Sequence, residues 1–180
     1  MAIRIFIDLG LDASTLRYFD EITPVLKNSG ASASWTRKGN FHLTLKFLGD
    51  TEENIAQKIS GELEGMVFQK IPYKLSRFGG FPNLRKPRVL WVGLESPMCI
   101  EVAQKIDAVC NKFGFPLEDR PFVPHLTLGR IREPFDFVKI VAELPPPSKD
   151  ELFFKNVVFF KSILSNSGPT YEPLWSKELG

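Results

Sequence analysis

Both histidines of the protein begin the same tetrapeptide, His-Leu-Thr-Leu, at His42–Leu45 and at His125–Leu128. From average residue usage, a given histidine is followed by Leu-Thr-Leu only about once in several thousand cases. Two such occurrences at the only two histidines are therefore very improbable by chance. The pair marks two related copies of one local site.

Side chains of a β-strand alternate between its two faces, which places His42 and Thr44 on the same face, about 6.7 Å apart along the chain. Leu43, Leu45 and Phe47 are then expected on the opposite face, toward a core. His125 and Thr127 repeat this arrangement in the second copy. If the chain is internally duplicated, a pseudo-twofold axis brings both polar pairs to one cleft.

Two imidazoles and two hydroxyls suit phosphodiester transfer or hydrolysis. One neutral histidine can act as a base and a protonated one as an acid, because imidazole titrates near neutral pH. Threonine hydroxyls can donate hydrogen bonds to phosphoryl oxygens. The sequence offers no cluster with the three or more ligands that a catalytic metal requires, so neither a metal nor another cofactor is expected. The alternative is that each His-x-Thr pair is only the solvated side of a sheet.

Hydrophobic periodicity predicts alternating strands and helices around these motifs. Asp50 is the predicted N-cap of the second helix, with Glu53 three residues later completing a capping box. Helices are expected over residues 11–27, 50–66, 97–114 and 135–144. Strands are expected over residues 3–9, 32–36, 41–48, 73–78, 88–94, 123–131, 152–164 and 170–175, with a turn over 166–169.

The order strand, helix, strand, helix, strand occurs twice and predicts an internally duplicated, bilobal α+β fold. No linker or low-complexity segment divides the chain, so residues 1–180 are expected to form a single domain.

The amino-acid composition excludes several classes of protein. Sixteen Phe, three Trp and three Tyr exclude a disordered chain, and a net charge of +2 is far from that of an extended duplex binder. Cys99 and Cys110 lie about 16 Å apart if the intervening segment is helical, too far for a disulfide. With no signal peptide and no apolar stretch long enough to span a membrane, the expected location is the cytoplasm.

The paired motifs, 83 positions apart, resemble those of the 2H phosphoesterase superfamily. The flanking sequences 40–49 (NFHLTLKFLG) and 120–130 (RPFVPHLTLGR) are similar to the RNA 2′,3′-cyclic phosphodiesterase branch, also called 2′-5′ RNA ligase. The start Arg4-Ile5-Phe6 and the tail with Ser162, Leu164, Gly168-Pro169 and Tyr171 fit the same branch. The resemblance covers nearly the whole chain.

This resemblance implies two mainly antiparallel sheets, flanked by helices, with a central cleft. The implied reaction is metal-independent hydrolysis of an RNA 2′,3′-cyclic phosphate to a 2′-phosphate. His42 would be the proton donor and His125 the proton acceptor, a division that the sequence alone leaves open. Thr44 and Thr127 would bind the phosphate.

Four further residues are candidates for substrate binding. Arg130 matches the family's arginine after the second motif, where a guanidinium can stack on the terminal base. Strict alternation places it opposite to Thr127, so a bulge or strand end must turn it into the cleft. Phe6 could cover the other side of the base, Tyr171 matches the tail, and Lys46 shares the expected face of His42.

The expected partner is RNA with a 2′,3′-cyclic phosphate end, including tRNA fragments, and the protein is expected to be a monomer without a membrane. Three alternatives stay open within nucleic-acid chemistry: reversible 2′-5′ ligation, hydrolysis of a small cyclic nucleotide, and a non-catalytic module that binds RNA ends. A fourth is a structural α+β protein whose repeats are fortuitous.

Overall fold

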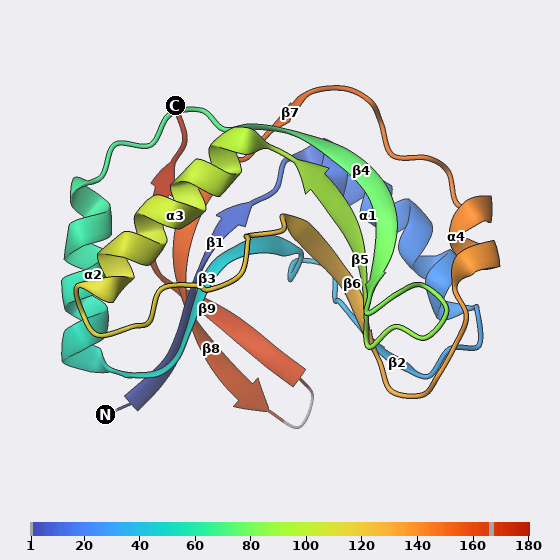
Figure 1. The fold of residues 1–180 in the computed structure, drawn as a ribbon, viewed down its shortest axis with the longest axis horizontal. Helices are drawn as coiled ribbons and strands as arrows, with labels where there is room; N and C mark the ends of the chain where they lie inside the picture. Colours follow the sequence, from blue (N-terminus) through green and yellow to red (C-terminus); the bar gives the residue numbers. More distant parts are fainter. Residues whose placement is uncertain (1, 166–167) are drawn as a thin grey trace.

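Two antiparallel sheets lie side by side, with helices on their outer faces, in the computed structural model, which describes residues 2–165 and 168–180 (Figure 1). The helices are α1 (Ala13–Lys27), α2 (Glu53–Gly65), α3 (Pro97–Asn111) and α4 (Val138–Glu143). The strands are β1 (Ala2–Gly10), β2 (Ala33–Trp35), β3 (His42–Glu52), β4 (Pro72–Phe81), β5 (Val89–Glu95), β6 (His125–Ile131), β7 (Leu152–Phe153), β8 (Asn156–Ser165) and β9 (Gly168–Glu178). Residues 166–167 of the expected turn lie outside the described part.

The topology confirms the internal duplication. One sheet has the strand order β3-β1-β8-β9 and the other β2-β6-β5-β4-β7. In each sheet the strand with the His-x-Thr motif pairs antiparallel with the strand that precedes a helix: β3 with β1, and β6 with β5. The order β6-β5-β4-β7 thus repeats β3-β1-β8-β9, and β2 is an addition along β6.

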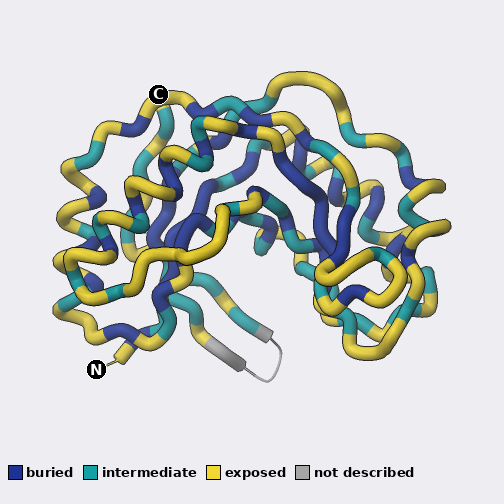
Figure 2. The backbone as a smooth tube through the Cα atoms, viewed as in Figure 1, coloured by how far each residue is buried: buried dark blue, intermediate teal, exposed yellow. Residues whose placement is uncertain are grey.

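The helices tie the two lobes together. Helix α1 follows β1 but lies beside the five-stranded sheet, where the Thr15 and Tyr73 hydroxyl oxygens are 2.6 Å apart (Figure 1). Helix α3 follows β5 but packs on β3 of the other sheet. Each repeat therefore covers the sheet of the other, and the buried residues form one continuous cluster along both sheets (Figure 2).

A bulge occurs at the same place in both motif strands. Between β1 and β3 the partner of Ile7 is Lys46 and that of Asp8 is Thr44, so Leu45 has no partner on β1. Between β5 and β6 the pairing likewise omits Leu128. Because an extra residue reverses the alternation of side chains beyond it, each bulge changes which later residues face the cleft.

The expected capping box of α2 is wrong. Strand β3 continues through Asp50 to Glu52, which pairs with Ala2, because the ladder with β1 satisfies this backbone. Glu52 takes the N-cap position without a side-chain cap bond. Strand β4 also extends beyond its expected end, as Gly79–Phe81 continue the pairing with β5. A side chain at Gly79 would collide with the Trp91 ring.

Asp12 is the cap that fixes α1. Its carboxylate accepts hydrogen bonds from the backbone N–H groups of Ser14 and Thr15 and from the Tyr73 hydroxyl on β4. It therefore stabilises both the helix end and the attachment of the helix to the second sheet.

We expect Asp12→Ala to lower the free energy of unfolding by about 1–2 kcal/mol, because it removes the cap and one partner of a buried hydroxyl. Asp50→Ala, at the exposed residue with the sequence signature of a cap, should change it by less than about 0.5 kcal/mol. Urea unfolding measures both. Equal losses would contradict the assignment of the cap.

Candidate active site

A cavity of about 570 Å³ contains both His-x-Thr pairs. His42 and Thr44 reach it from β3, and His125 and Thr127 from β6, where the two sheets approach each other. The sequence expectation of convergence is therefore met in the geometry. The full lining comprises Ser34, Trp35, Thr36, Arg37, Asn40, His42, Thr44, His125, Thr127, Arg130, Arg132, Pro169 and Tyr171.

The first histidine is largely enclosed by aromatic rings. The centroids of Phe6 and Tyr171 lie 5.3 Å from that of His42, and 20% of the His42 side chain is exposed. Burial lowers the pKa of His42 to about 4, and an interaction with the backbone of Asn40 raises it by less. Oδ2 of the buried Asp8 carboxyl group lies 3.7 Å from Nδ1 of His42.

The second histidine has a different environment. Its Nδ1 lies 2.7 Å from the carbonyl oxygen of Val123, and the rings of Phe81 and Trp91 flank it. When Nδ1–H donates to this carbonyl, the neutral ring carries its lone pair on Nε2. The carbonyl of Val123, two residues before the start of β6, thus favours the tautomer of His125 that can accept a proton on Nε2.

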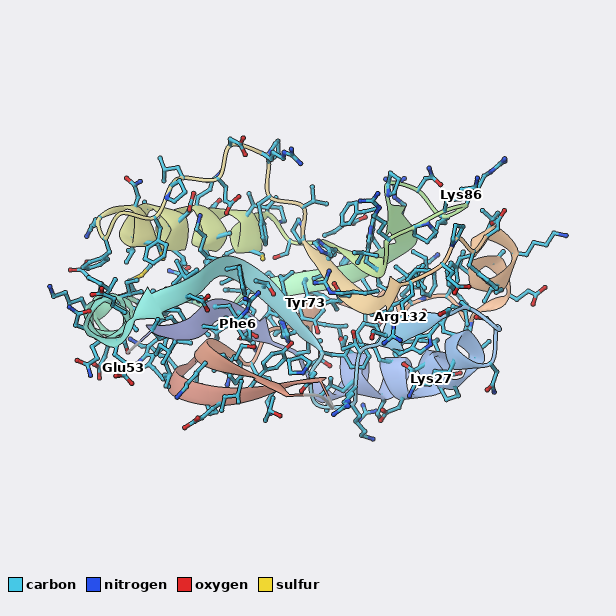
Figure 3. The ribbon with its side chains drawn as sticks, turned by 90° about the horizontal axis from the view of Figure 1, so that it is seen from below. Phe6, Lys27, Glu53, Tyr73, Lys86 and Arg132 are labelled. Carbon is cyan, nitrogen blue, oxygen red and sulfur yellow. The ribbon has the colours of Figure 1, made fainter. Side chains whose placement is uncertain are left out.

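Three arginines make the cavity cationic. Arg37 precedes β3, Arg130 lies on β6 and Arg132 follows β6. Figure 3 shows Arg132 in the lobe opposite Phe6. The bulge at Leu128 places Arg130 on the same face as Thr127, which strict alternation would not allow. Its charge lowers the pKa of Tyr171, against the larger raising effect of burial. Such a cavity attracts a phosphodiester anion.

Phe6 and Lys46 do not line the cavity. Phe6 is 4% exposed and packs behind His42, against Phe160 and Tyr171. The expected face of Lys46 is wrong, because the bulge at Leu45 turns this side chain away from the His42 side.

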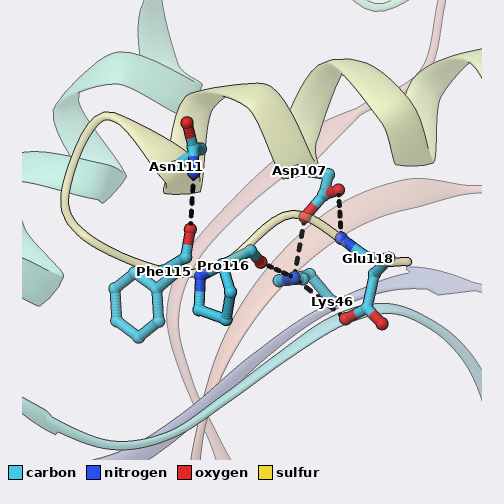
Figure 4. A network of polar contacts seen from close by, with 6 residues as sticks. All are labelled: Lys46, Asp107, Asn111, Phe115, Pro116 and Glu118. Atoms are coloured by element: carbon cyan, nitrogen blue, oxygen red, sulfur yellow. Dashed lines mark hydrogen bonds and ion pairs between the residues drawn. The ribbon is translucent and has the colours of Figure 1, made fainter.

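Lys46 instead forms ion pairs with Asp107 on α3 and with Glu118, and donates to the carbonyl of Pro116 (Figure 4). Burial lowers the pKa of Lys46, but its hydrogen bonds to both carboxylates outweigh this effect and raise it overall. The same bulge places Phe47, expected in the core, at the surface with 50% exposed, where Arg4 covers its ring. Lys46 thus connects β3 to α3 and the loop after it.

The described ranges 2–165 and 168–180 contain no group of three or more His, Cys, Asp or Glu side chains that could hold a metal ion. None of the described helices is long and apolar enough to cross a membrane.

Sequence reasoning missed several lining residues. Trp35, Arg37 and Arg132 come from β2 and from segments beside the motif strands, and only the tertiary arrangement brings them to the cavity. Sequence reasoning also missed Asp8, which does not line the cavity but lies beside His42. An acidic residue within the apolar strand Ile3–Leu9 was the sequence feature that could have drawn attention to it.

Known proteins resemble this chain over most of its length. A family model described as LigT like Phosphoesterase matches residues 9–91 and 95–171. The chain is 31% identical to an RNA 2′,3′-cyclic phosphodiesterase of Methanothermobacter thermautotrophicus, over 95% of this chain and 96% of the relative.

Two solved structures share the fold. A protein of Thermus thermophilus superposes with a TM-score of 0.82 at 24% identity, covering 98% of both chains. E. coli LigT complexed with 3′-AMP superposes with a TM-score of 0.79 at 23% identity, covering 99% of both chains. The bilobal α+β architecture with two antiparallel sheets is therefore confirmed.

We expect Lys46→Met to lower the free energy of unfolding by about 2–3 kcal/mol, because it leaves the largely buried Asp107 carboxylate without its cation. Catalytic efficiency of the folded variant should stay within about twofold, since Lys46 lies outside the cavity. Lys112→Met, which breaks an exposed pair with Glu62, is the control and should cost less than about 1 kcal/mol. A large loss of activity with unchanged stability would assign Lys46 to substrate binding.

Proposed function

The chain belongs to the LigT-like phosphoesterase family, and we propose that it hydrolyses the 2′,3′-cyclic phosphate at the end of an RNA to a 2′-phosphate. The observation that carries this proposal is the convergence of two His-x-Thr pairs in one cavity. The relative from Methanothermobacter thermautotrophicus, similar over nearly its whole length, supports the same activity.

In the proposed mechanism, His125 takes a proton from a water molecule that attacks the phosphorus, and His42 protonates the departing 3′ oxygen. The tautomer fixed by the Val123 carbonyl suits a proton acceptor at His125. Thr44 and Thr127, each two residues from a histidine on the same face, donate hydrogen bonds to the phosphoryl oxygens. The reaction needs no metal in this scheme.

The arginines and Tyr171 of the cavity would bind the RNA end. Arg130, which lines the cavity, would offset the negative charge that develops on the phosphate and would stack its guanidinium on the terminal base. Tyr171, which lines the cavity and contacts the His42 ring edge-on, is the second base-contacting candidate. Phe6 would act from behind His42, by fixing the imidazole ring rather than by touching the base.

The protein is expected to work as a single bilobal domain and as a monomer, because both lobes contribute to one cavity and share one core. The buried free thiols of Cys99 and Cys110 are compatible with a reducing compartment, and we propose the cytoplasm.

The decisive experiment is incubation of the purified protein, with EDTA present, with a short RNA that ends in a 2′,3′-cyclic phosphate. We expect a 2′-phosphate product at a rate that EDTA does not change. A 3′-phosphate product would overturn the assignment of the leaving group. Loss of activity in EDTA, restored by added metal, would overturn the metal-free mechanism.

The same preparation distinguishes the alternatives. Turnover of a mononucleoside 2′,3′-cyclic phosphate but not of the RNA would indicate a small cyclic substrate. Formation of 2′-5′-linked product from RNA ends with a 2′,3′-cyclic phosphate and a 5′-hydroxyl would indicate ligation. Tight binding of the RNA without turnover would indicate a module that binds RNA ends.

His42→Ala and His125→Ala should each lower kcat/KM by at least about 100-fold, the usual contribution of one acid–base group. Phe47→Ala is a control on the same strand as His42, because this exposed ring lies outside the cavity, and it should keep nearly full activity. Steady-state kinetics on the cyclic-phosphate RNA measure all three. A histidine variant with wild-type activity would remove that histidine from the mechanism.

A further inference from the structure

The two repeats differ at one position beside the histidines. Asp8 on β1 lies opposite Thr44, and the corresponding residue opposite Thr127 on β5 is Trp91. Two positions further along, both repeats have glycine: Gly10 opposite His42 and Gly93 opposite His125. The matching registers therefore place a carboxyl group beside the first histidine and an indole beside the second.

The stability of the fold does not explain why the carboxyl group of Asp8 is buried. It is 1% exposed, and neither of its oxygens has a hydrogen-bond partner. Burial of an unpartnered carboxylate is costly, and it raises the pKa of Asp8 well above the usual value. Oδ2 of Asp8 lies 3.7 Å from Nδ1 of His42, within the distance of an ion pair.

We propose that Asp8 is a positioning residue that stabilises the protonated ring of His42 and so makes His42, not His125, the proton donor. This inference rests on the proposed function and adds the residue that breaks the symmetry between two otherwise equivalent motifs.

The physical reason is that the pair can hold one proton without a net charge. Burial disfavours an isolated imidazolium at His42 and an isolated carboxylate at Asp8. Moving the proton from the carboxyl group to the imidazole leaves the pair neutral overall. A phosphate anion in the cavity then favours the imidazolium, and a carboxylate within about 4–6 Å stabilises it further.

The second motif has no such partner. No ion pair joins His125 to a carboxylate within residues 2–165 and 168–180, and its Nδ1 faces the Val123 carbonyl. The other charged or titratable groups around the cavity are Arg37, Arg130, Arg132 and Tyr171. Of these, Arg130 lies on β6 and Arg132 follows it, whereas Tyr171 contacts the His42 ring.

The proton balance closes in one cycle. As the water oxygen bonds to phosphorus, its proton passes to His125. The bond from phosphorus to O3′ breaks, and O3′ receives the proton of His42. The buried pair, now one proton short, is restored when His125 releases its proton to solvent and the pair takes one up.

The test uses the fact that the protein has only two histidines. In protein with ¹³C-labelled histidine, two ring signals are followed from pH 3 to 9, and His125→Gln assigns them. Inorganic phosphate is present because an anion in the cavity favours the imidazolium and so raises the pKa of His42 from about 4 into this range. We expect the His42 signal to titrate about one pH unit or more lower in Asp8→Asn than in wild type. The His125 signal should titrate at the same pH in both.

Kinetics supply a second readout. Asp8→Asn should lower kcat by about 10- to 100-fold, less than removal of His42, with KM within about threefold. The alkaline limb of its pH–rate profile should move toward acid. Thr51→Val, which removes another buried polar group on β3 outside the cavity, should change neither the titrations nor the profile.

Both measurements are repeated on Asp8→Ala, because the asparagine of Asp8→Asn can form a new hydrogen bond. Circular dichroism checks that both variants fold. Identical His42 titrations in wild type and both variants would overturn the role of Asp8. Absence of turnover by the wild-type protein would overturn the proposed function instead, because the titrations do not depend on catalysis.

Discussion

The pairing of each motif strand with its neighbour is the constraint on which the site depends. Antiparallel pairing of β3 with β1, and of β6 with β5, fixes the face toward which each histidine and threonine points. The bulge after each threonine then resets the alternation, which sends Lys46 to the helix side and Arg130 to the cavity. A shift of either pairing by one residue would turn the whole site into the core.

The exchange of helices between the lobes makes this arrangement rigid. Helix α1 is held beside the second sheet through Asp12 and Tyr73, and α3 is held on the first through Lys46 and Asp107. Because each helix belongs to one repeat and covers the other, relative movement of the lobes would disrupt a shared core. The shared core therefore opposes movements that would change the spacing of the two histidines, which come from different lobes.

A symmetric framework carries an asymmetric site. The backbone positions around His42 and His125 correspond residue by residue, yet their surroundings differ in kind. Each ring interacts with the backbone of the residue two positions earlier, Asn40 for His42 and Val123 for His125. The surroundings differ because His42 is enclosed by Phe6, Tyr171 and a buried carboxyl group, while the rings of Phe81 and Trp91 flank His125. Acid and base catalysis by two identical side chains requires such a difference, because each must hold its proton at a different moment.

The sequence by itself determined the duplication, the chemistry of the paired motifs and most strands and helices, because these depend on local periodicity and on a repeated tetrapeptide. Even the need for a bulge before Arg130 followed from counting residues. Only the tertiary structure decided the faces of Lys46 and Phe47, the start of α2 after Glu52 rather than after Asp50, and the contributions of Trp35 and Arg132. These features depend on pairing between distant strands. The pairing of β3 with β1 extends β3 past Asp50 and leaves Leu45 as an extra, unpaired residue in the strand.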